Sequence, residues 1–418
     1  MKEPVSKSDL KVPGERMLLF LMAAIQFTIV VDFLIIMPLG PQYLRVLSIT
    51  PAQFGLIVSA YAISAGISGF AAGFFLDRFD RKSALLWLYF GFAIGTLFCA
   101  LAPNYLLLIG ARTIAGAFGG VAGALILTII GDVIPPERRG AAMGMVMSSF
   151  SVASICGMPI GLFLAAHLSW HIPFFVLAAL SGFILIAALR IMPSLRGHLQ
   201  SSRTGHPALQ VWAVLMERDH QIAFVFTAAL MFAGFCIFPF ISTYMVANVG
   251  VTEKQLPLIY LSGGLATLFS MNWIGRWADR AGKLRVFTRM SLSTVVPILA
   301  LTNLPRIPLV AAIATTTLFM VCMSGRFVPA MALITASVEP RYRGGFMSMN
   351  SSVQQFTSGL AAYVSGQIIG RSSSGEMTHF PVIGIFSLGC TFLCIYLARR
   401  LKGPEGKEAV SEPMVIEG

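Results

Sequence analysis

Charged residues are scarce in this chain. Only 11% of its 418 residues are Asp, Glu, Lys or Arg, whereas a soluble globular protein carries about 25% charged residues. Hydrophobic residues make up 56% of the chain, and the mean hydropathy is +0.79. This composition excludes a soluble enzyme, a disordered chain and a nucleic-acid-binding domain, so it predicts no nucleic-acid partner.

Motifs for catalysis, nucleotides and metals are missing as well. The sequence contains no G-x-x-x-x-G-K-[ST] loop, no H-E-x-x-H and no cluster of His and Cys at metal-ligand spacing. Its six cysteines lie inside apolar stretches and form no C-x-x-C pair, which is typical of small buried thiols. We therefore predict a protein that is not an enzyme and that needs no cofactor and no metal.

Long apolar stretches recur along the chain, separated by short polar breaks. A bilayer span needs about 20 mostly apolar residues, and backbone polar groups in lipid must be satisfied within a helix or a closed barrel. The stretches do not alternate with a period of two, so we predict an all-α membrane protein with twelve transmembrane helices. They are expected near 17–39, 54–76, 83–102, 104–130, 141–166, 171–192, 220–248, 255–278, 284–303, 307–336, 344–370 and 381–398.

The polar segments divide the chain into five parts. A polar connector follows the sixth apolar stretch, and both ends of the chain are polar. We therefore predict a cytoplasmic N-terminal segment at 1–16, six-helix bundles at 17–192 and 220–398, a cytoplasmic linker at 193–219 and a cytoplasmic tail at 399–418.

Basic residues are unevenly distributed between the two sets of loops. With twelve spans, both chain ends lie on the same side of the membrane. Of the 30 Lys and Arg, four lie in the opposite loops (Arg45, Lys254, Arg306 and Arg371) and two lie within spans, which leaves 24 on the side of the chain ends. The positive-inside rule then predicts cytoplasmic termini, in a plasma membrane that would be the inner membrane of a bacterium. Anionic lipid headgroups are sufficient partners for this charge.

Two short patterns occur once in each half of the chain. The pattern G-x-x-x-D-R occurs at 73–78 and 275–280, and the pattern R-G-x-x-M-x-M-x-x-S occurs at 139–148 and 343–352. The copies are 202 and 204 residues apart, and two independent matches at nearly one offset indicate a duplicated six-helix unit. A parallel repeat of this kind is a transporter architecture, with the substrate site between the halves.

The loop after the second predicted helix closely resembles the signature loop of the major facilitator superfamily. In that superfamily the loop latches the two halves together on the cytoplasmic side, and its partners include an acidic residue at the end of the fourth helix and the dipole at the start of the eleventh. Charge-assisted bonds and a carboxylate at a helix N-terminus suit such a latch. The alternative for the basic residues alone is positive-inside topology. The resemblance assigns to the gate Gly73, Asp77, Arg78, Arg81, Lys82, Asp132, Gly275, Asp279 and Arg280.

Further segments narrow the resemblance to one branch of the superfamily. The spacing Leu108-x-x-x-Arg112-x-x-x-Gly116 resembles the fourth-helix motif that is common in proton-coupled members. Segments 32–38, 157–161 and 325–330 are similar to those of the twelve-helix drug:proton antiporters, including arabinose-efflux-like permeases. The resemblance implies the major facilitator fold, with two pseudo-symmetric six-helix bundles, and a monomer that binds a small-molecule substrate and protons.

Of the 18 acidic residues, only Asp32 falls clearly within a predicted span. An Asp at a helix centre costs roughly 2.5–3.5 kcal/mol on insertion scales, so it needs a partner or a function. At 1.5 Å per residue, Asp32 and Arg112 both lie roughly 6–8 Å to the outer side of the midplane. We predict that they meet and couple transport to protons. The structural alternatives are a hydrogen bond to a neighbouring helix and a permanent salt bridge.

Other polar and aromatic side chains within spans are candidates for lining a substrate cavity. The polar ones would be unfavourable in lipid, so they are expected to face a cavity or to bond across helices. Phe235 belongs to a phenylalanine-rich helix, for which a pocket for lipophilic compounds and contact with lipid or other side chains are the alternatives. Arg326 lies roughly 7 Å to the cytoplasmic side of its helix centre, and three interpretations stay open for it: an anionic substrate group, backbone carbonyls, or snorkelling to the interface. The candidates are Gln26, Tyr61, Phe235, Asn272, Arg326, Asn350 and Gln354.

Three functions follow from these patterns. The first is secondary active transport by alternating access, with proton-coupled efflux (antiport) of a drug, sugar or metabolite. The second is a symporter or facilitator that imports a metabolite. This alternative stays open because Met158 separates Gly157 from Pro159, where the antiporter motif has adjacent Gly and Pro. The third is a membrane receptor or scaffold, although the short loops leave no room for a large partner-binding domain.

Overall fold

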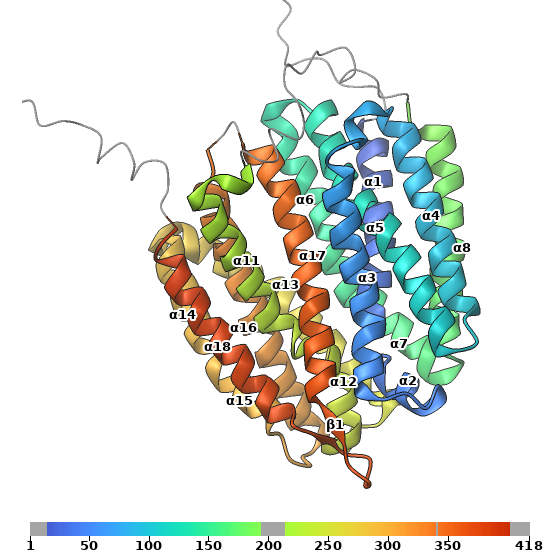
Figure 1. Ribbon diagram of the computed structural model, residues 1–418, viewed down its shortest axis with the longest axis vertical. Helices are drawn as coiled ribbons and strands as arrows, with labels where there is room; N and C mark the ends of the chain where they lie inside the picture. Colours follow the sequence, from blue (N-terminus) through green and yellow to red (C-terminus); the bar gives the residue numbers. More distant parts are fainter. Residues whose placement is uncertain (1–14, 194–213, 340–341, 402–418) are drawn as a thin grey trace, which may run out of the picture.

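The computed structural model describes residues 15–193, 214–339 and 342–401. Within these ranges the chain forms long helices that run roughly along one axis, in two groups that follow the two halves of the sequence (Figure 1). Strands in the described ranges are limited to one short hairpin, in which Gly370–Arg371 (β1) pairs antiparallel with Met377–Thr378 (β2). The all-α architecture predicted from the apolar stretches is confirmed.

Eight α-helices form the first group. Two of their starts follow directly from capping residues: Thr50 and Gln53 form a reciprocal capping box before one helix, and Asn104 accepts a hydrogen bond from the Leu107 amide before another. The helices are α1 (Glu15–Ile35), α2 (Gly40–Val46), α3 (Pro51–Ala72), α4 (Arg81–Leu101), α5 (Tyr105–Val133), α6 (Pro136–Val152), α7 (Met158–His167) and α8 (His171–Ile191).

The second group also consists mainly of α-helices, with more interruptions than the first. The 3-10 segment η4 (Phe238–Phe240) and the π-helix η5 (Met245–Val249) flank a single α-helical turn, and a π-helix, η3 (Ala153–Gly157), also links α6 to α7 in the first group. The helices are α11 (Arg218–Phe235), α12 (Ile241–Tyr244), α13 (Leu256–Ala281), α14 (Lys283–Ser293), α15 (Val295–Thr302), α16 (Leu309–Ala336), α17 (Arg343–Ile368) and α18 (Phe380–Ala398).

Each of the twelve predicted spans corresponds to a long helical segment, and ten of these, within the described residues, are long and apolar enough to cross a membrane. The other two are α13 and α17, which are long enough, at 26 residues each, but more polar. Both pack against the opposite half: α17 runs beside α3, and α13 beside α7. Each helix therefore has one side covered by protein of the opposite half in place of lipid. The short helix α2 was not predicted.

Glycine permits the close approach of α3 and α17. A Cβ atom added to Gly66 would lie 2.8 Å from the Phe356 amide nitrogen, and one added to Gly366 would lie 2.9 Å from the Pro51 carbonyl oxygen. Only residues without a side chain fit such contacts, as in small-residue packing of membrane helices. This contact holds the two halves together along one edge.

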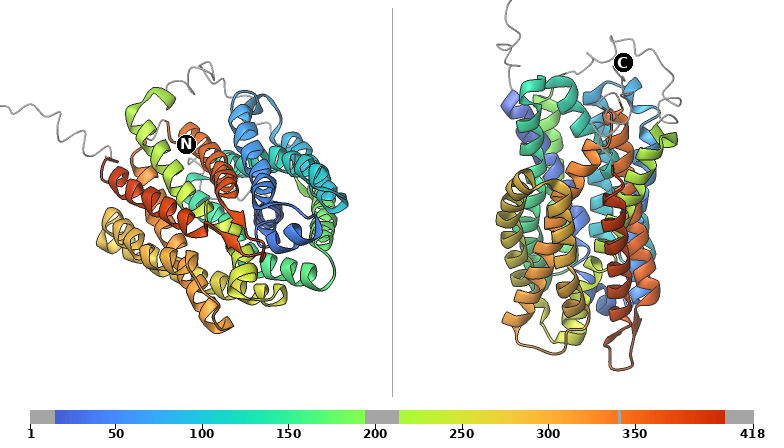
Figure 2. Two further views of the ribbon diagram at one scale, coloured as in Figure 1. Left: turned by 60° about the horizontal axis from the view of Figure 1, so that its bottom comes forward. Right: turned by 90° about the vertical axis from the view of Figure 1, so that its left-hand side faces the viewer.

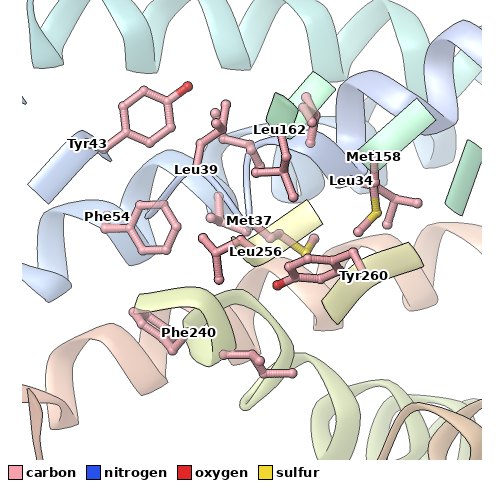
Figure 3. Close-up of a cluster of buried hydrophobic side chains, with 14 of the residues drawn as sticks. Leu34, Met37, Leu39, Tyr43, Phe54, Met158, Leu162, Phe240, Leu256 and Tyr260 are labelled. Atoms are coloured by element: carbon pink, nitrogen blue, oxygen red, sulfur yellow. The ribbon is translucent and has the colours of Figure 1, made fainter. Parts of the chain in front are cut away.

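The two ends of the molecule differ in how the halves meet. We call the end where α1 begins and α18 ends the terminal face, and the opposite end, which carries the hairpin, the distal face (Figures 1 and 2). Toward the terminal face each half has its own hydrophobic core. Toward the distal face the halves share one core, in which Leu34 and Phe54 of the first half meet Phe240 and Tyr260 of the second (Figure 3). The shared core closes the distal face.

Candidate functional site

Asp32 and Arg112 meet in the interior of the first half. Asp32 lies near the end of α1, and Arg112 lies in the third turn of α5, which runs in the opposite direction. Arg112 Nη1 donates to Asp32 Oδ2 over 2.8 Å and to the Asp32 backbone carbonyl over 3.2 Å. Both side chains are fully buried. The structure therefore brings together two residues that were predicted to lie at the same depth.

Neighbouring side chains complete the surroundings of this pair. Thr96 on α4 donates to Asp32 Oδ1 over 3.2 Å. The Arg112 guanidinium carbon lies 4.4 Å from the centre of the Tyr61 ring, within the range of a cation–π contact. Arg112 Nε and Nη2 and the Tyr61 hydroxyl are buried without a hydrogen-bond partner among the described residues. The site thus holds one carboxylate, one guanidinium and polar groups with unused hydrogen-bonding capacity.

Small residues allow the helices to build this site. A Cβ atom on Gly116 would lie 2.7 Å from Tyr61 Cα, and one on Gly95 would lie 2.7 Å from Ala115 Cα. The glycines therefore let α5 pack closely on α3 and α4. This packing explains why Gly116 lies one helical turn after Arg112: the glycine lets the part of α5 that carries the arginine lie against α3.

The gate residues predicted in the first half lie at the terminal face. Gly73 ends α3, and Arg78 follows in an exposed 3-10 turn. Arg81 is buried, and its Nε lies 3.0 Å from Asp132 Oδ2 on α5. Lys82 donates to the Leu189 carbonyl over 3.4 Å. These contacts join helices of the same half.

The Asp77 side chain, which was also predicted to form part of the gate, lies outside the described residues. The second copy of the pattern, at Gly275, Asp279 and Arg280, ends α13 at the same face. There Asp279 lines a surface pocket together with Lys283, Arg285, Arg289 and Arg399.

The predicted cavity residues are not gathered in one place. Tyr61 belongs to the Asp32–Arg112 site, and the ring of Phe235 lies 5.9 Å from the ring of Phe33 across the two halves. Asn350 is buried within the second half, where Thr227 donates to its side-chain oxygen over 2.7 Å. Gln26 and Gln354 are half-buried, and Asn272 is exposed on α13.

Arg326 is buried in the second half. It is 2% exposed, and its Nη1 donates to the Thr391 hydroxyl on α18 over 2.9 Å. No acidic side chain of the described residues forms an ion pair with it.

Sequence reasoning missed three contributors. The first is Thr96, which could have been found as a polar residue within an apolar span. The 2.8 Å ion pair between Arg45 and Glu253 joins the two halves at the distal face. Nothing in the sequence pairs these two residues, because they are 208 positions apart in chain order. Phe33, next to Asp32, contacts both Tyr61 and Phe235, and it gave no signal among so many phenylalanines.

Comparisons with known proteins agree on the family. The family model described as "Major Facilitator Superfamily" matches residues 22–315 and 223–415. Among the curated relatives, the uncharacterized MFS-type transporter YceJ of Bacillus subtilis is 26% identical over 377 residues, covering 88% of this chain and 92% of the relative. The inner membrane transport protein YdhP of Escherichia coli K12 is 23% identical, again over 88% and 92%.

Solved structures show the same fold. A bacterial homolog of the human lysosomal transporter Spinster, in an inward-facing and occupied conformation, superposes with a TM-score of 0.74 at 16% identity, over 94% of this chain and 98% of that one. A D-xylose-proton symporter gives a TM-score of 0.71 at 14% identity, over 90% and 96%.

Proposed function

Because this chain belongs to the Major Facilitator Superfamily, and is thus an integral membrane transporter and not an enzyme, we propose that it exports a small molecule in exchange for protons. The observation that carries this proposal is the buried ion pair of Asp32 and Arg112. A carboxylate inside a membrane protein is costly, and ionisable residues there commonly mark ion and proton pathways. Asp32 is the residue that takes up and releases the proton.

Proton binding changes the contacts of the pair. In the ionised form, Asp32 accepts hydrogen bonds from Arg112 and from Thr96. A proton on Asp32 removes the charge that neutralises Arg112, which then needs another partner. The unused hydrogen-bonding groups of Arg112 and Tyr61 are available at that moment. Proton uptake and a change of partner at Arg112 are thereby linked, which is the requirement for coupling.

We assign the terminal face to the cytoplasm, since it carries most of the basic residues. The termini, the 193–219 linker and the gate around Arg81 and Asp132 then lie inside the cell, in the plasma membrane of a bacterium. Residues 17–192 and 220–398 form the two bundles, and they rock against each other around the substrate site of a monomer surrounded by lipid.

The shared core at the distal face corresponds to a state that is closed to the outside. Aromatic packing across the halves, with 5.6 Å between the ring centres of Phe54 and Phe240, supports this assignment. The ion pair of Arg45 and Glu253 adds a contact at the rim. The likeness to a bacterial homolog of Spinster in an inward-facing conformation is consistent with the same state.

The rim ion pair leads to a testable prediction. Arg45→Glu is expected to open the distal face more often and to raise the alkylation rate of buried Cys99 by about two- to fivefold, because an exposed ion pair contributes only about 0.2–1 kcal/mol. Cys99 belongs to the shared core, whereas Cys156 is exposed and serves as the internal control. The double variant Arg45→Glu/Glu253→Arg should restore the slow rate. An unchanged alkylation rate of Cys99 in the single variant would show that this ion pair does not help to close the distal face.

The direction of coupling is tested by reconstitution. Proteoliposomes with a trapped pH dye are exposed to a compound library, and proton movement is compared with compound movement. Antiport requires a compound that drives protons opposite to its own movement. The second candidate is symport, which is supported by the structural likeness to a D-xylose-proton symporter. Protons and compound moving together would replace the export proposal with that one.

A further inference from the structure

Arg326 is an uncompensated positive charge inside the second half. Its side chain is 2% exposed, and the partner it has among the described residues is one neutral hydroxyl, that of Thr391. Arg112, a buried arginine of the first half, is neutralised by Asp32 at 2.8 Å. A buried charge without a counter-charge is unfavourable, so the two arginines are in different situations.

The structure removes two of the three interpretations that the sequence left open. A snorkelling arginine would extend its guanidinium toward the membrane surface, but Arg326 is enclosed and bonds to the neighbouring helix α18. An arginine held by the backbone would donate to carbonyl oxygens, and no such hydrogen bond from Arg326 exists among the described residues. An anionic group from outside the chain is the interpretation that remains.

The surroundings of Arg326 suit a small anion. Among the described residues, Cys236 on α11 and Cys390 and Cys394 on α18 are the ionisable groups that lie close to the guanidinium. A protonated thiol carries no charge, so these groups are not a counter-charge for Arg326. Gly325 lets α16 pack closely on its neighbours, since a Cβ atom there would lie 2.6 Å from Ile274 Cδ1. Arg326 is a buried donor whose planar guanidinium matches carboxylate, phosphate or sulfonate oxygens.

We infer that Arg326 binds an anionic group of the transported molecule, so that the substrate class is an organic anion carrying a carboxylate, phosphate or sulfonate. This inference rests on the proposed transport function, but it concerns a different site from the proton pair. The buried Asp32–Arg112 pair has no net charge, so Asp32 can take up and release a proton without a charge on the substrate.

Thermal stability separates a binding site from a structural role. Arg326→Met is expected to raise the melting temperature of the substrate-free protein by a few degrees, because a buried unpaired charge is replaced by an apolar chain of similar length. The matched control is Arg112→Met, which leaves Asp32 unpaired and should lower the melting temperature. A marked fall for Arg326→Met would indicate a structural arginine and would overturn the inference.

Binding is tested with matched pairs of probes. Benzoate, benzenesulfonate and phenylphosphonate are compared with benzamide, benzenesulfonamide and dimethyl phenylphosphonate, together with citrate and inorganic phosphate. We expect at least one anion, and not its neutral partner, to raise the melting temperature of the wild-type protein. The same anion should slow alkylation of Cys390 but not of exposed Cys156. Arg326→Met should lose both effects, and Arg326→Lys should retain part of them.

The outcomes distinguish this inference from the transport proposal. Equal effects of the anions and their neutral partners, no effect of any anion, or an anion effect that survives Arg326→Met would each overturn the anion site. Anion binding that depends on Arg326, in a protein that moves no protons with the anion, would keep the site and remove proton coupling. Proton-coupled transport of a neutral compound would keep the coupling and remove the anion site.

Discussion

Asp32→Asn is expected to reduce transport driven by a pH gradient to the level of empty liposomes. The amide has nearly the shape of the carboxyl group, but it cannot take up and release a proton. Exchange of substrate across the membrane in the absence of a gradient does not require proton release and should persist. The measurement compares gradient-driven uptake with exchange in the same proteoliposomes, and it uses a trapped pH dye to follow protons.

The same substitution should also destabilise the protein. Asp32→Asn leaves Arg112 charged and unpaired, and removing one partner of a buried ion pair costs about 3–5 kcal/mol. Arg112→Gln alone should cost a similar amount. The double variant Asp32→Asn/Arg112→Gln buries no charge at this site and should recover most of the stability. It should still fail to couple transport to protons.

This cycle separates the two roles that the ion pair can have. If the pair were only structural, the double variant would recover both stability and gradient-driven transport. If Asp32 carries the proton, stability returns and coupling does not. Full proton-coupled transport by Asp32→Asn would contradict the proposed mechanism directly.

The contact between Asp32 and Arg112 could be predicted because both residues lie on helices whose direction and depth follow from the chain. Helix rise per residue converts position in a span into depth, and two residues at one depth in the same bundle can meet. The binding partner of Arg326 could not be identified from depth in the same way. Depth says where a side chain starts, whereas the choice among lipid surface, carbonyl and anion depends on which neighbours surround it.

Contacts between the halves were the least predictable part of the fold. The helix ranges followed from hydropathy, and the polarity of α13 and α17 was already visible in Asn272, Asn350 and Gln354. Sequence alone could not decide whether those residues faced a cavity or a protein neighbour. The structure places Asn350 against Thr227 within its own half, and it joins Arg45 to Glu253 across both halves. Contacts between the halves depend on how the two bundles pack together, and a local sequence pattern does not predict this packing.

The largest effect outside the proton site is expected at the contact of α3 with α17. Gly66→Leu places a side chain where a Cβ atom alone would lie 2.8 Å from the Phe356 amide nitrogen and 3.0 Å from Phe356 Cα. These are backbone atoms of the opposite half, so they cannot turn aside as the end of a flexible side chain can. Overpacking of this kind costs about 1–3 kcal/mol and sometimes more. We expect Gly66→Leu to abolish transport.

Gly182→Leu on α8 is the matched control, because nothing lies within 4 Å of a Cβ atom at that position. It should transport at the wild-type rate, and its stability should be unchanged or slightly higher, since glycine is unfavourable inside a helix. Melting temperature, transport and the alkylation rate of Cys99 are measured for both variants. Wild-type transport by Gly66→Leu would show that the halves do not need this close approach.

The combination of these three readouts locates the effect. If Gly66→Leu melts at a lower temperature and loses transport, the glycine contact is needed to assemble the halves. If the melting temperature is retained while transport is lost, the contact is needed for their movement, because a bulky residue then obstructs the sliding of α3 on α17 without unfolding either helix. A changed Cys99 rate in that second case would give the direction of the arrest. A faster rate places the variant in a state open at the distal face, and a slower rate places it in the closed state described here.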